Sequence, residues 1–519
     1  MPILTAQFFN SAHKHSQMPA LFFKETTISY DVLLESVQRL ASGLHQLGVE
    51  KGDRVAIMLP NVPHFCICYY AILSLGAVVV PLNFMHDVDE IHHQLSDSGA
   101  QTLILWQGFY ASSYKAYSRV PTCKTIIYLG DKIPGHSLSL TQIIASSSPE
   151  PPAVDLEESD MAVIHYTSGI SDIALGAELS HDAIAANSST CVEMFRINGQ
   201  DRLVAALPLF HPLGQTLIMH ASFTAGAGLV LLPRFQPLEV VRAIQTFGVT
   251  FMPAVPALFR ALIELQGDDL EIPSLKYCMS YGGFLALETL QDFEKKYHVT
   301  ILKAYGLTEA GPLVSSSRIS QEAKPESAGL PLVGVEVQIR NESSAILRPN
   351  QCGEIFVKSP SLMRGYHSQA AESQKRLQNG WLATGDIGYI DIEHNLFIQE
   401  RKDDIILKGG FEIFPREVER VLADFPGVSE VAVIAITDPI HGSEVKAFIV
   451  PQKDKKLDAH ALQEYCQSYL PVYKCPKYVE FIDALPKSPT GRVLKRFLRA
   501  GSASKAAKPS AVSESEKTV

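Results

Sequence analysis

The sequence has no pair of cysteines at the C-x-x-C spacing that metal sites and redox-active disulfides use. Its eight cysteines are scattered along the chain, and only Cys66 and Cys68 lie close together. This spacing argues against a zinc ribbon and a disulfide framework. It predicts buried thiols in a protein of the cytoplasm.

The sequence also lacks an excess of positive charge. Lysine and arginine number 45 against 55 aspartates and glutamates, so the formal net charge is −10 at pH 7. A nucleic-acid-binding surface needs clustered cations, and this balance argues against one. A modest acidic excess is ordinary for a soluble enzyme and carries no information about the substrate.

No targeting segment, membrane span or repeat is expected. The first residues, MPILTAQFFNSAHKHSQ, have neither the basic start nor the apolar centre of a signal peptide. The apolar run from Phe65 to Leu82 contains two cysteines, two tyrosines and a glycine. It is interpreted as a buried helix that leads into a buried strand, not as a membrane span. No repeat of the solenoid kind is present.

What the sequence does contain is apolar residues in alternating strand and helix patterns. The chain has 519 residues, 46% of them apolar, which is enough for more than one domain. Residues 21–30 predict a short hairpin, and Ser29 is expected to cap an amphipathic helix that Gly48 ends. The run that ends at Pro81 is fully apolar, as in parallel sheets. The alternation predicts an α/β fold with a mostly parallel sheet.

The stretch HYTSGISDIALGAELSH, residues 165–181, begins as a phosphate-binding loop. Tyr166, Thr167, Ser168 and Gly169 offer two hydroxyls, backbone amides and a flexible glycine, which are the parts that hold phosphoryl oxygens. The stretch resembles the glycine-rich loop of the acyl-activating (ANL) superfamily, which reads YTSGTTGxPKGVxxSH. That superfamily contains acyl-CoA synthetases, aryl-CoA ligases, peptide-synthetase adenylation domains and luciferase.

The loop departs from this pattern although the alignment needs no gap. Ile170 and Ser171 fall on the two threonines, Asp172 on the second glycine, Ala174 on the proline and Leu175 on the lysine. An aspartate beside a polyphosphate adds repulsion, and it occupies a position where glycine takes backbone angles more easily. The length of the loop is therefore kept, but the lysine that supplies its positive charge is replaced by Leu175.

The resemblance covers residues 8 to about 499 and implies a two-domain architecture. Residues 1–400 are expected to form a large domain of mostly parallel sheets layered with helices, which binds the acyl group and the nucleotide. Residues 401–499 are expected to form a small mobile α+β domain. Residues 500–519 are of low complexity and are expected to be disordered.

Two motifs of the large domain resemble the acyl and adenine pockets. LVAALPLFHPLG places His211 at the histidine of the acyl-pocket motif, with a loop-capping role as the alternative. In MSYGGFL, the resemblance implies that Gly282 and Gly283 flank the adenine and acyl pockets. Phe284 stands where the family usually has alanine. We expect its ring either to narrow the site, which would favour a short or flat acid, or to pack in the core.

The motif LKAYGLTEAG is the strongest single match. The resemblance implies that Tyr305 stacks on adenine, that Thr308 contacts phosphate and that Glu309 binds Mg²⁺. A carboxylate suits this hard cation.

The motifs that follow resemble the ribose site, the hinge and the thiol entrance. Asp386, in TGD, resembles the ribose ligand, because a carboxylate accepts both hydrogen bonds of a vicinal diol. The resemblance further implies that Arg401 contacts AMP, that Asp403 is the hinge, and that Gly409 and Gly410 leave room for a pantetheine arm. Glu400 replaces the usual glycine before the arginine.

The last motif, LPKSPTGRVLKRFLR, changes the family's catalytic lysine. The lysine normally follows TG directly; here that residue is Arg492, and Lys495 stands where the family has arginine. Arginine keeps the charge but has a planar fork in place of a point ammonium. We take His211, Glu309, Arg492 and Lys495 as the candidate catalytic side chains.

These departures affect the first half of the family reaction, in which a carboxylate attacks the α-phosphate of ATP. The residues of the second half, in which a thiol attacks acyl-AMP, are retained. Three functions are therefore weighed. The first is an acyltransferase that passes an acyl or aryl group between acyl-CoA and CoA, or to the phosphopantetheine of an acyl carrier protein. The second is an ATP- and Mg²⁺-dependent acyl- or aryl-CoA ligase, and the third is a non-catalytic acyl-CoA or AMP-binding protein.

Overall fold

The computed structural model describes residues 3–131, 134–135, 137–167, 174–267, 270–319, 321, 324–408, 411–438, 442–487 and 493–499. These residues form two compact units. The larger contains the described residues up to Thr384 together with Tyr389–Phe397, and the smaller contains Gly385–Gly388 and the described residues from Ile398 onward. Each unit is described separately below.

The larger unit contains a nine-stranded sheet. Its strand order is β16 (Leu330–Pro331), β15 (Leu313–Ser316), β14 (Thr300–Gly306), β13 (Tyr277–Ser280), β12 (Phe251–Ala254), β10 (Arg202–Ala205), β11 (Gly228–Leu231), β1 (Pro19–Phe23) and β2 (Thr26–Ser29). The pairings from β14 to β1 are parallel, and the strands at the two edges are antiparallel.

The second large sheet has eight strands in the order β19 (Gly365–Tyr366), β9 (Leu175–Ser180), β8 (Met161–Thr167), β4 (Val78–Pro81), β3 (Arg54–Met58), β5 (Thr102–Trp106), β6 (Thr125–Leu129) and β7 (Leu138–Ser139). Only the pairings of β9 are antiparallel. Both large sheets are thus mostly parallel, as the sequence predicts.

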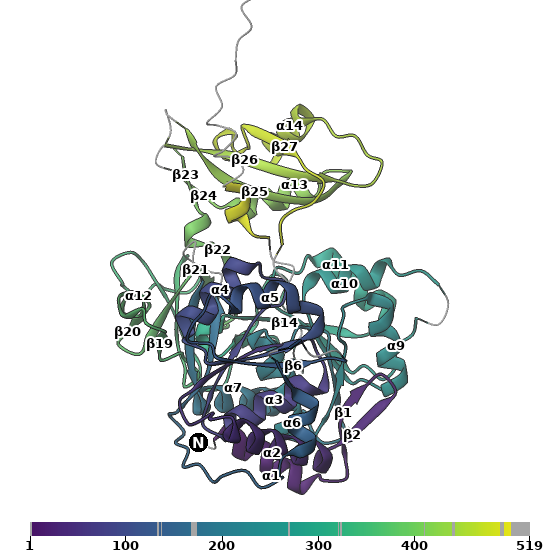
Figure 1. Ribbon diagram of the computed structural model, residues 1–519. Helices are drawn as coiled ribbons and strands as arrows, with labels where there is room; N and C mark the ends of the chain where they lie inside the picture. Colours follow the sequence, from purple (N-terminus) through teal and green to yellow (C-terminus); the bar gives the residue numbers. More distant parts are fainter. Residues whose placement is uncertain are drawn as a thin grey trace, which may run out of the picture. The chain divides into compact units, whose positions relative to one another are not determined.

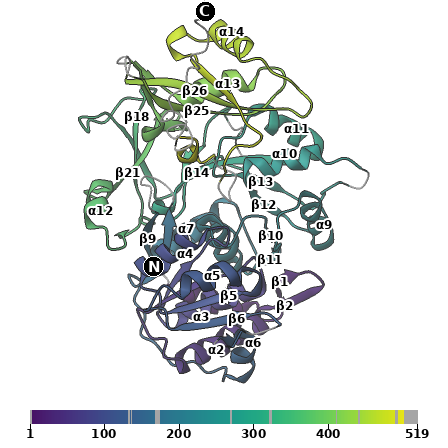
Figure 2. The ribbon, with the colours of Figure 1, turned by 45° about the horizontal axis from the view of Figure 1, so that its top comes forward.

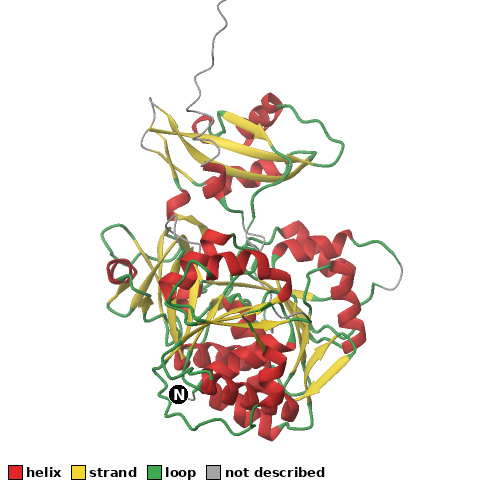
Figure 3. Cartoon of the chain, in the orientation of Figure 1, coloured by secondary structure: helices red, strands yellow, loops and turns green. Residues whose placement is uncertain are grey.

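A layer of helices lies between these two sheets and gathers at the base of the larger unit (Figures 1 and 3). Its helices are α1 (Leu4–Lys14), α2 (Tyr30–Gln46), α3 (Pro63–Ser74), α6 (Leu140–Ser146), α7 (His181–Met194), the π-helix η2 (Gly214–His220) and α8 (Ala221–Ala225). Helix α3 contacts β3 and β4 of one sheet, whereas η2 contacts β10 and α8 contacts β11 of the other. Helix α3 is apolar on every face because it is enclosed on every face.

The outer faces of both sheets are covered as well. Helices α9 (Pro237–Phe247), α10 (Pro256–Glu264) and α11 (Leu287–Tyr297) lie beside β10, β12 and β13 (Figure 2) and share one apolar core with them. Helices α4 (Val88–Ser98) and α5 (Tyr110–Tyr117), joined to β5 by the 3-10 turn η1 (Gln107–Phe109), form a second core with the eight-stranded sheet. Strands covered on both faces read as continuous apolar runs, which explains the sequence pattern.

The remaining elements complete the two units. A five-stranded sheet contains β17 (Glu336–Arg340), β18 (Gly353–Lys358), β21 (Trp381–Ile390), β20 (Leu377–Gln378) and β22 (Leu396–Arg401), and helix α12 (Ala370–Arg376) precedes β20. The smaller unit has β23 (Ile406–Lys408), β24 (Phe411–Ile413), α13 (Pro415–Ala423), β25 (Val428–Asp438), β26 (Gly442–Pro451), α14 (Ala459–Tyr469), η5 (Val472–Lys474) and β27 (Tyr478–Phe481). It is α+β, as predicted.

One local expectation needs correction. Helix α2 begins after Ser29, as predicted, but the hydroxyl of Ser29 makes no capping bond to the helix backbone. It donates instead to the carboxylate of Asp31, which in turn accepts from the N–H of Val32. The Asp31 carboxylate, and not the Ser29 hydroxyl, therefore accepts the hydrogen bond from a free backbone N–H at this end of the helix.

Candidate functional site

The two stems of the glycine-rich loop lie opposite each other in the eight-stranded sheet. Thr167 ends β8 and Leu175 begins β9, and the two residues are partners in the antiparallel ladder. Ser168 and Gly169 of the predicted phosphate site lie outside the described residues. The half-buried Leu175 takes the position of the missing lysine at the first residue of the second stem.

Helix α4 holds both stems. The hydroxyl of Tyr166 donates to the Asp97 carboxylate at 2.7 Å, and His93 Nε2 lies 2.9 Å from the carbonyl oxygen of Ala174. Burial and the charge of Asp97 raise the pKa of Tyr166, so its phenol stays protonated and remains a donor. Neither His93 nor Asp97 was identified from the sequence, because α4 lies about seventy residues before the loop and carries no motif.

The predicted metal ligand, Glu309, is a buried carboxylate with one fixed oxygen. It lies in the 3-10 turn η3 (Thr308–Ala310), is 7% exposed, and accepts a hydrogen bond from the hydroxyl of Tyr366 at 2.9 Å. The carbonyl oxygen of Glu309 also accepts from the N–H of Met363. The sequence interpretation gave Tyr366 no role.

Strand β19 connects Glu309 to the glycine-rich loop. Tyr366 pairs with Ala177 and Gly365 with Glu178, both in the strand that follows the loop. Next to this pairing, His367 Nδ1 lies 2.7 Å from the Glu178 carboxylate. The chain therefore brings the second stem of the loop and the Glu309 carboxylate together on one short strand.

His211 lies in the turn before η2 and faces the predicted adenine segment. Its ring centroid is 6.3 Å from that of Tyr281, the residue before Gly282 and Gly283. Burial lowers the pKa of His211 to about 4, so the imidazole is neutral at pH 7. Its Nδ1 accepts from the N–H of Leu213 at 3.2 Å. The ring proton is therefore assigned to Nε2, which makes that nitrogen a donor.

The predicted adenine segment, residues 282–284, has two glycines followed by an exposed phenylalanine. Gly282 has a φ of +80°, which residues with a side chain rarely adopt, whereas the φ of Gly283 lies outside this left-handed region. Phe284 is 43% exposed. This exposure overturns the core-packing alternative for its ring and leaves a site-narrowing role as a prediction.

The motif that contains Tyr305 and Thr308 is held from two sides. Tyr305 lies half-buried near the end of β14, and a Cβ added at the next residue, Gly306, would be 1.8 Å from the carbonyl oxygen of Pro312. The hydroxyl of Tyr281 donates to the same carbonyl oxygen at 3.4 Å. The glycine is therefore required by the close approach of the backbone, and the motif, its flanking turn and the adenine segment form one packed group.

In the smaller unit, the predicted ribose ligand and the predicted AMP contact are paired. Arg401 Nε lies 3.2 Å from Asp386 Oδ1, and both side chains are largely shielded from solvent. Asp403, the predicted hinge, is exposed in the 3-10 turn η4 (Lys402–Asp404). The predicted thiol-entrance glycines, Gly409 and Gly410, lie outside the described residues, as does Arg492.

Lys495 is described, and it is buried. Its Nζ lies 2.8 Å from the Glu419 carboxylate of α13, and its side chain is only 12% exposed. The structure thus places this candidate catalytic side chain in an ion pair internal to the smaller unit.

Comparison with known proteins decides the family. The family model for the AMP-binding enzyme matches residues 8–367, and the model for the AMP-binding enzyme C-terminal domain matches residues 417–492.

The chain belongs to the AMP-binding enzyme family.

Relatives of this AMP-binding enzyme are acyl-CoA ligases. It is 34% identical to "Long-chain-fatty-acid--CoA ligase" of Bacillus subtilis over 94% of its own length and 92% of the relative's. Among solved structures it is similar to ATP-bound MatB from Rhodopseudomonas palustris, with a TM-score of 0.89, 28% identity and coverage of 96% and 98%. It is also similar to a Mycobacterium tuberculosis fatty acyl CoA synthetase, with a TM-score of 0.78, 29% identity and coverage of 97% and 99%. These comparisons confirm the predicted superfamily, and relatives within it are named as fatty-acid CoA ligases or synthetases.

The Glu309 carboxylate fits the magnesium ion that this family implies. Mg²⁺ is usually held by one or two carboxylates together with substrate phosphates and water. Glu309 is buried, and Tyr366 takes one of its oxygens and fixes the orientation of the carboxylate. Among the described residues no hydrogen bond to its second oxygen is found, and this is the atom that would take the cation.

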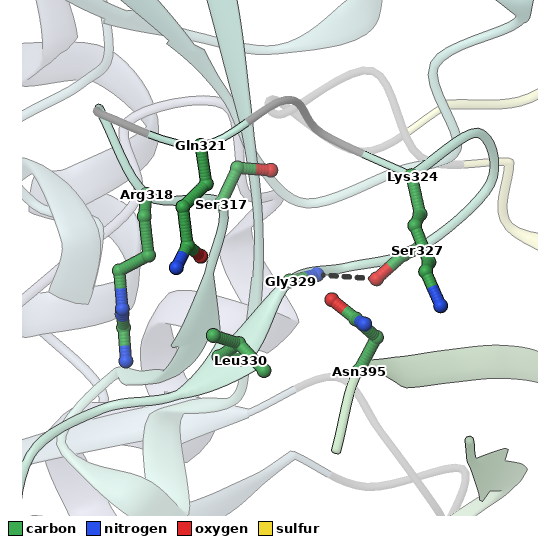
Figure 4. Close-up of a pocket in the computed structure, with 8 residues that line it drawn as sticks. All are labelled: Ser317, Arg318, Gln321, Lys324, Ser327, Gly329, Leu330 and Asn395. Carbon is green, nitrogen blue, oxygen red and sulfur yellow. Dashed lines mark hydrogen bonds between the residues drawn. The ribbon is translucent and has the colours of Figure 1, made fainter. Parts of the chain in front are cut away.

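A separate small pocket lies at the edge of the nine-stranded sheet (Figure 4). Its volume of about 20 Å³ suffices for one or two waters and not for a nucleotide. Lys324, at its rim, already pairs with Asp391 and Glu393, and the Arg318 guanidinium donates to the carbonyl oxygen of Pro331. This pocket is polar packing, and we assign it no ligand.

Across the described part of the chain, no helix combines the length and the apolar character needed to cross a bilayer.

Proposed function

We propose that this enzyme is an ATP-dependent acyl-CoA ligase, which converts a carboxylic acid, ATP and CoA to acyl-CoA, AMP and pyrophosphate. The observation that carries the proposal is the pairing of β19 with β9. It holds a buried, oriented carboxylate beside the stem of the glycine-rich loop. A protein that had lost adenylation has no evident need to keep this carboxylate fixed.

In the first half-reaction the substrate carboxylate oxygen bonds to the α-phosphorus, and the bond from phosphorus to pyrophosphate breaks. Glu309 would hold Mg²⁺, which supplies neutralisation of phosphate charge. Thr167, Ser168, Gly169 and Thr308 would contact phosphate oxygens. Arg492 would supply the cation between the carboxylate and the α-phosphate.

In the second half-reaction the CoA sulfur bonds to the acyl carbon and AMP leaves. Gly409 and Gly410 would border the entering thiol. Tyr305, Gly282 and Gly283 would hold the adenine, and Asp386 and Arg401 the ribose. His211, neutral with its Nε2 proton, would donate to an oxygen at the boundary of the acyl pocket.

The substrate class follows from the relatives. Two of the three relatives compared above are named for fatty acids, and we propose a fatty acid as the substrate. The exposed ring of Phe284 keeps aryl acids as the alternative, because it directly follows the two glycines that the resemblance places beside the acyl pocket. We further propose a cytoplasmic location, since all eight cysteines are free thiols and seven are buried.

ATP-independent acyl transfer is the second candidate, and one observation favours it. Leu175 occupies the position of the loop lysine and provides no charge for the polyphosphate. Loss of one preorganised group of this kind costs about 10²–10³ in rate, which lowers adenylation without abolishing it. Of the two proposed functions, only acyl transfer would use a carrier protein as the acceptor of the acyl group.

The test is mass spectrometry of two parallel reactions. One contains the protein, ATP, Mg²⁺, CoA and a panel of fatty and aryl acids. The other contains the matching acyl-CoAs with a phosphopantetheinylated carrier protein and no ATP. Thioester formed only with ATP supports the ligase, whereas acyl transfer without ATP overturns it. Ligand binding without turnover in either reaction indicates a non-catalytic binding protein.

A further inference from the structure

The last described segment of the chain, residues 493–499, is fixed within the smaller unit by charged side chains. Lys495 pairs with Glu419 of α13, and Arg499 pairs with Asp404 of the turn η4. Glu419 also accepts from the N–H of Val433 at 2.8 Å, so its carboxylate is held by strand β25 as well. The segment is thereby tied to a helix, a strand and the turn after β22.

A second carboxylate acts on the same lysine through its charge. Glu400, in β22, is 9% exposed, and its two oxygens accept from the backbone N–H groups of Arg401 and Arg416. Burial raises the pKa of Glu400, whereas the charge of Lys495 lowers it. Burial opposes the charge of Lys495 as well. Glu419, Glu400 and Asp404 outweigh that effect and raise the pKa of the lysine.

These contacts join two sequence departures that lie far apart along the chain. Glu400 stands where the resemblance expects glycine, and Lys495 stands where it expects arginine. In the folded chain the charges of these two side chains act on each other, since each shifts the pKa of the other. The ammonium is already used within the smaller unit, because moving it to a substrate would leave the largely shielded Glu419 carboxylate without its counter-charge.

The same ion pair lies close to Arg492 in the sequence. Lys487 and Val493, on either side of residues 488–492, form an antiparallel bridge, and the N–H of Leu494 donates to the carbonyl oxygen of Pro486 at 2.8 Å. Lys487 also pairs with Glu430 of β25 at 2.6 Å. The described residues on either side of 488–492 therefore lie together at one anchored point, and Lys495 secures the side that follows Arg492.

We propose that Lys495 is a positioning residue, not the cation that contacts substrate. Through its ion pair with Glu419 it holds the segment that follows Arg492, and so positions that arginine for the first half-reaction. This inference rests on the proposed ligase function.

The test measures the two half-reactions separately. Pyrophosphate release from ATP with a fatty acid reports the first, and thioester formation from synthetic acyl-AMP and CoA reports the second. The variants are Lys495→Met, Lys495→Arg, Arg492→Ala and the double variant Arg492→Ala/Lys495→Met. The matched control is Lys446→Met, because Lys446 is also 12% exposed and pairs with Glu480 in the same unit.

Lys495→Met should lower the first half-reaction on the order of 10²-fold, the usual cost of a small misplacement of a catalytic group. The second half-reaction should change less than about threefold, and Lys495→Arg should restore most of the first. The double variant should be no slower than Arg492→Ala, because Lys495 acts through that arginine. Lys446→Met should not separate the two half-reactions.

Three results would overturn the inference. Equal loss of both half-reactions in Lys495→Met would show that the lysine only stabilises the unit. Additive losses in the double variant would show that it acts independently of Arg492, and an unchanged first half-reaction would show that it positions nothing.

Hydrogen exchange provides a readout that does not depend on activity. Lys495→Met should lose protection in residues 493–499 while β25 and β26 keep theirs, and loss across the whole unit would contradict the inference. A wild-type enzyme that releases no pyrophosphate with any acid refutes the proposed function instead. The exchange result then still decides whether Lys495 anchors the segment.

Discussion

Three fully buried histidines predict that the larger unit loses stability in mild acid. His165, His181 and His220 are each no more than 4% exposed. Burial is the largest cause of their lowered pKa values, which are about 3 for His165 and His220 and about 4 for His181. Their rings are neutral in the folded chain throughout the range in which an unfolded histidine takes up a proton near pH 6.5.

The direction follows from proton linkage. Between pH 6.5 and about 4 the unfolded chain binds more protons than the folded chain, so the free energy of unfolding falls as the pH falls. Each histidine contributes its full stability above pH 6.5. Each loses between about 1 and 2 kcal/mol on going from pH 7.5 to 5.5, and the three together lose about 4 kcal/mol. This magnitude depends little on the folded pKa, provided that it lies well below 5.5.

The assay is urea unfolding followed by tryptophan fluorescence at pH 7.5 and pH 5.5. Both tryptophans, Trp106 and Trp381, belong to the larger unit and report on it alone. Comparison of the wild type with His181→Leu cancels the other titrating groups. Neither ring nitrogen of His181 has a hydrogen-bond partner among the described residues, so the substitution breaks no hydrogen bond there.

His181→Leu should reduce the pH-induced loss of stability by roughly 1 kcal/mol. The control is His45→Leu, at an exposed position near the end of α2, which should leave the pH dependence unchanged. Equal pH dependence in the wild type and in His181→Leu would refute the reasoning, because it would mean that His181 takes up its proton alike in the folded and unfolded chains.

Three further predictions concern the first half-reaction. Tyr366→Phe removes a hydrogen bond to a charged group that is worth about 1.5–3 kcal/mol. It should raise the Mg²⁺ concentration needed for half-maximal pyrophosphate release, and an unchanged magnesium titration would argue against Glu309 as the ligand. Leu175→Lys should raise a wild-type rate that is already measurable by up to about 10²–10³ in a true ligase, because it restores one preorganised cation at the loop. Rescue from near zero would favour acyl transfer. His93→Ala frees the carbonyl oxygen of Ala174 and should raise the KM for ATP while the melting temperature stays within about 2 °C, and a KM that does not change would contradict the stem-holding role of α4.

The sequence predicted local features well. The apolar run that ends at Pro81 is β4, the hairpin before α2 is β1 and β2, and the amphipathic helix ends just before Gly48. These features depend on short-range periodicity, on turn residues and on continuous apolar runs, all of which a single sequence displays. The motif around Glu309 could likewise be placed without coordinates, because its residues are contiguous.

The partners of those motif residues could not be predicted. Tyr366 follows Glu309 by 57 residues, and Lys495 follows Glu419 by 76, yet each pair is brought together by the fold. No periodicity links such positions, and each residue alone is ordinary. The exposure of Phe284 was open for the same reason, since a phenylalanine after a turn fits either a core or a surface.

The two altered cation positions have different structural consequences, and this difference favours the ligase. At the C-terminal motif Lys495 forms an ion pair with Glu419, and the charge of Glu400 also acts on it, so the segment keeps an anchor. At the loop, Leu175 brings no compensating charge, yet both stems remain fixed by Tyr166 with Asp97 and by His93. Fixed stems keep the ends of the loop in place even without the lysine. One missing cation lowers the adenylation rate by about 10²–10³, but a loop with unanchored stems would lose the phosphate site altogether. We therefore expect a slow ligase whose first half-reaction limits turnover, with a burst-free time course of pyrophosphate release that matches acyl-CoA formation.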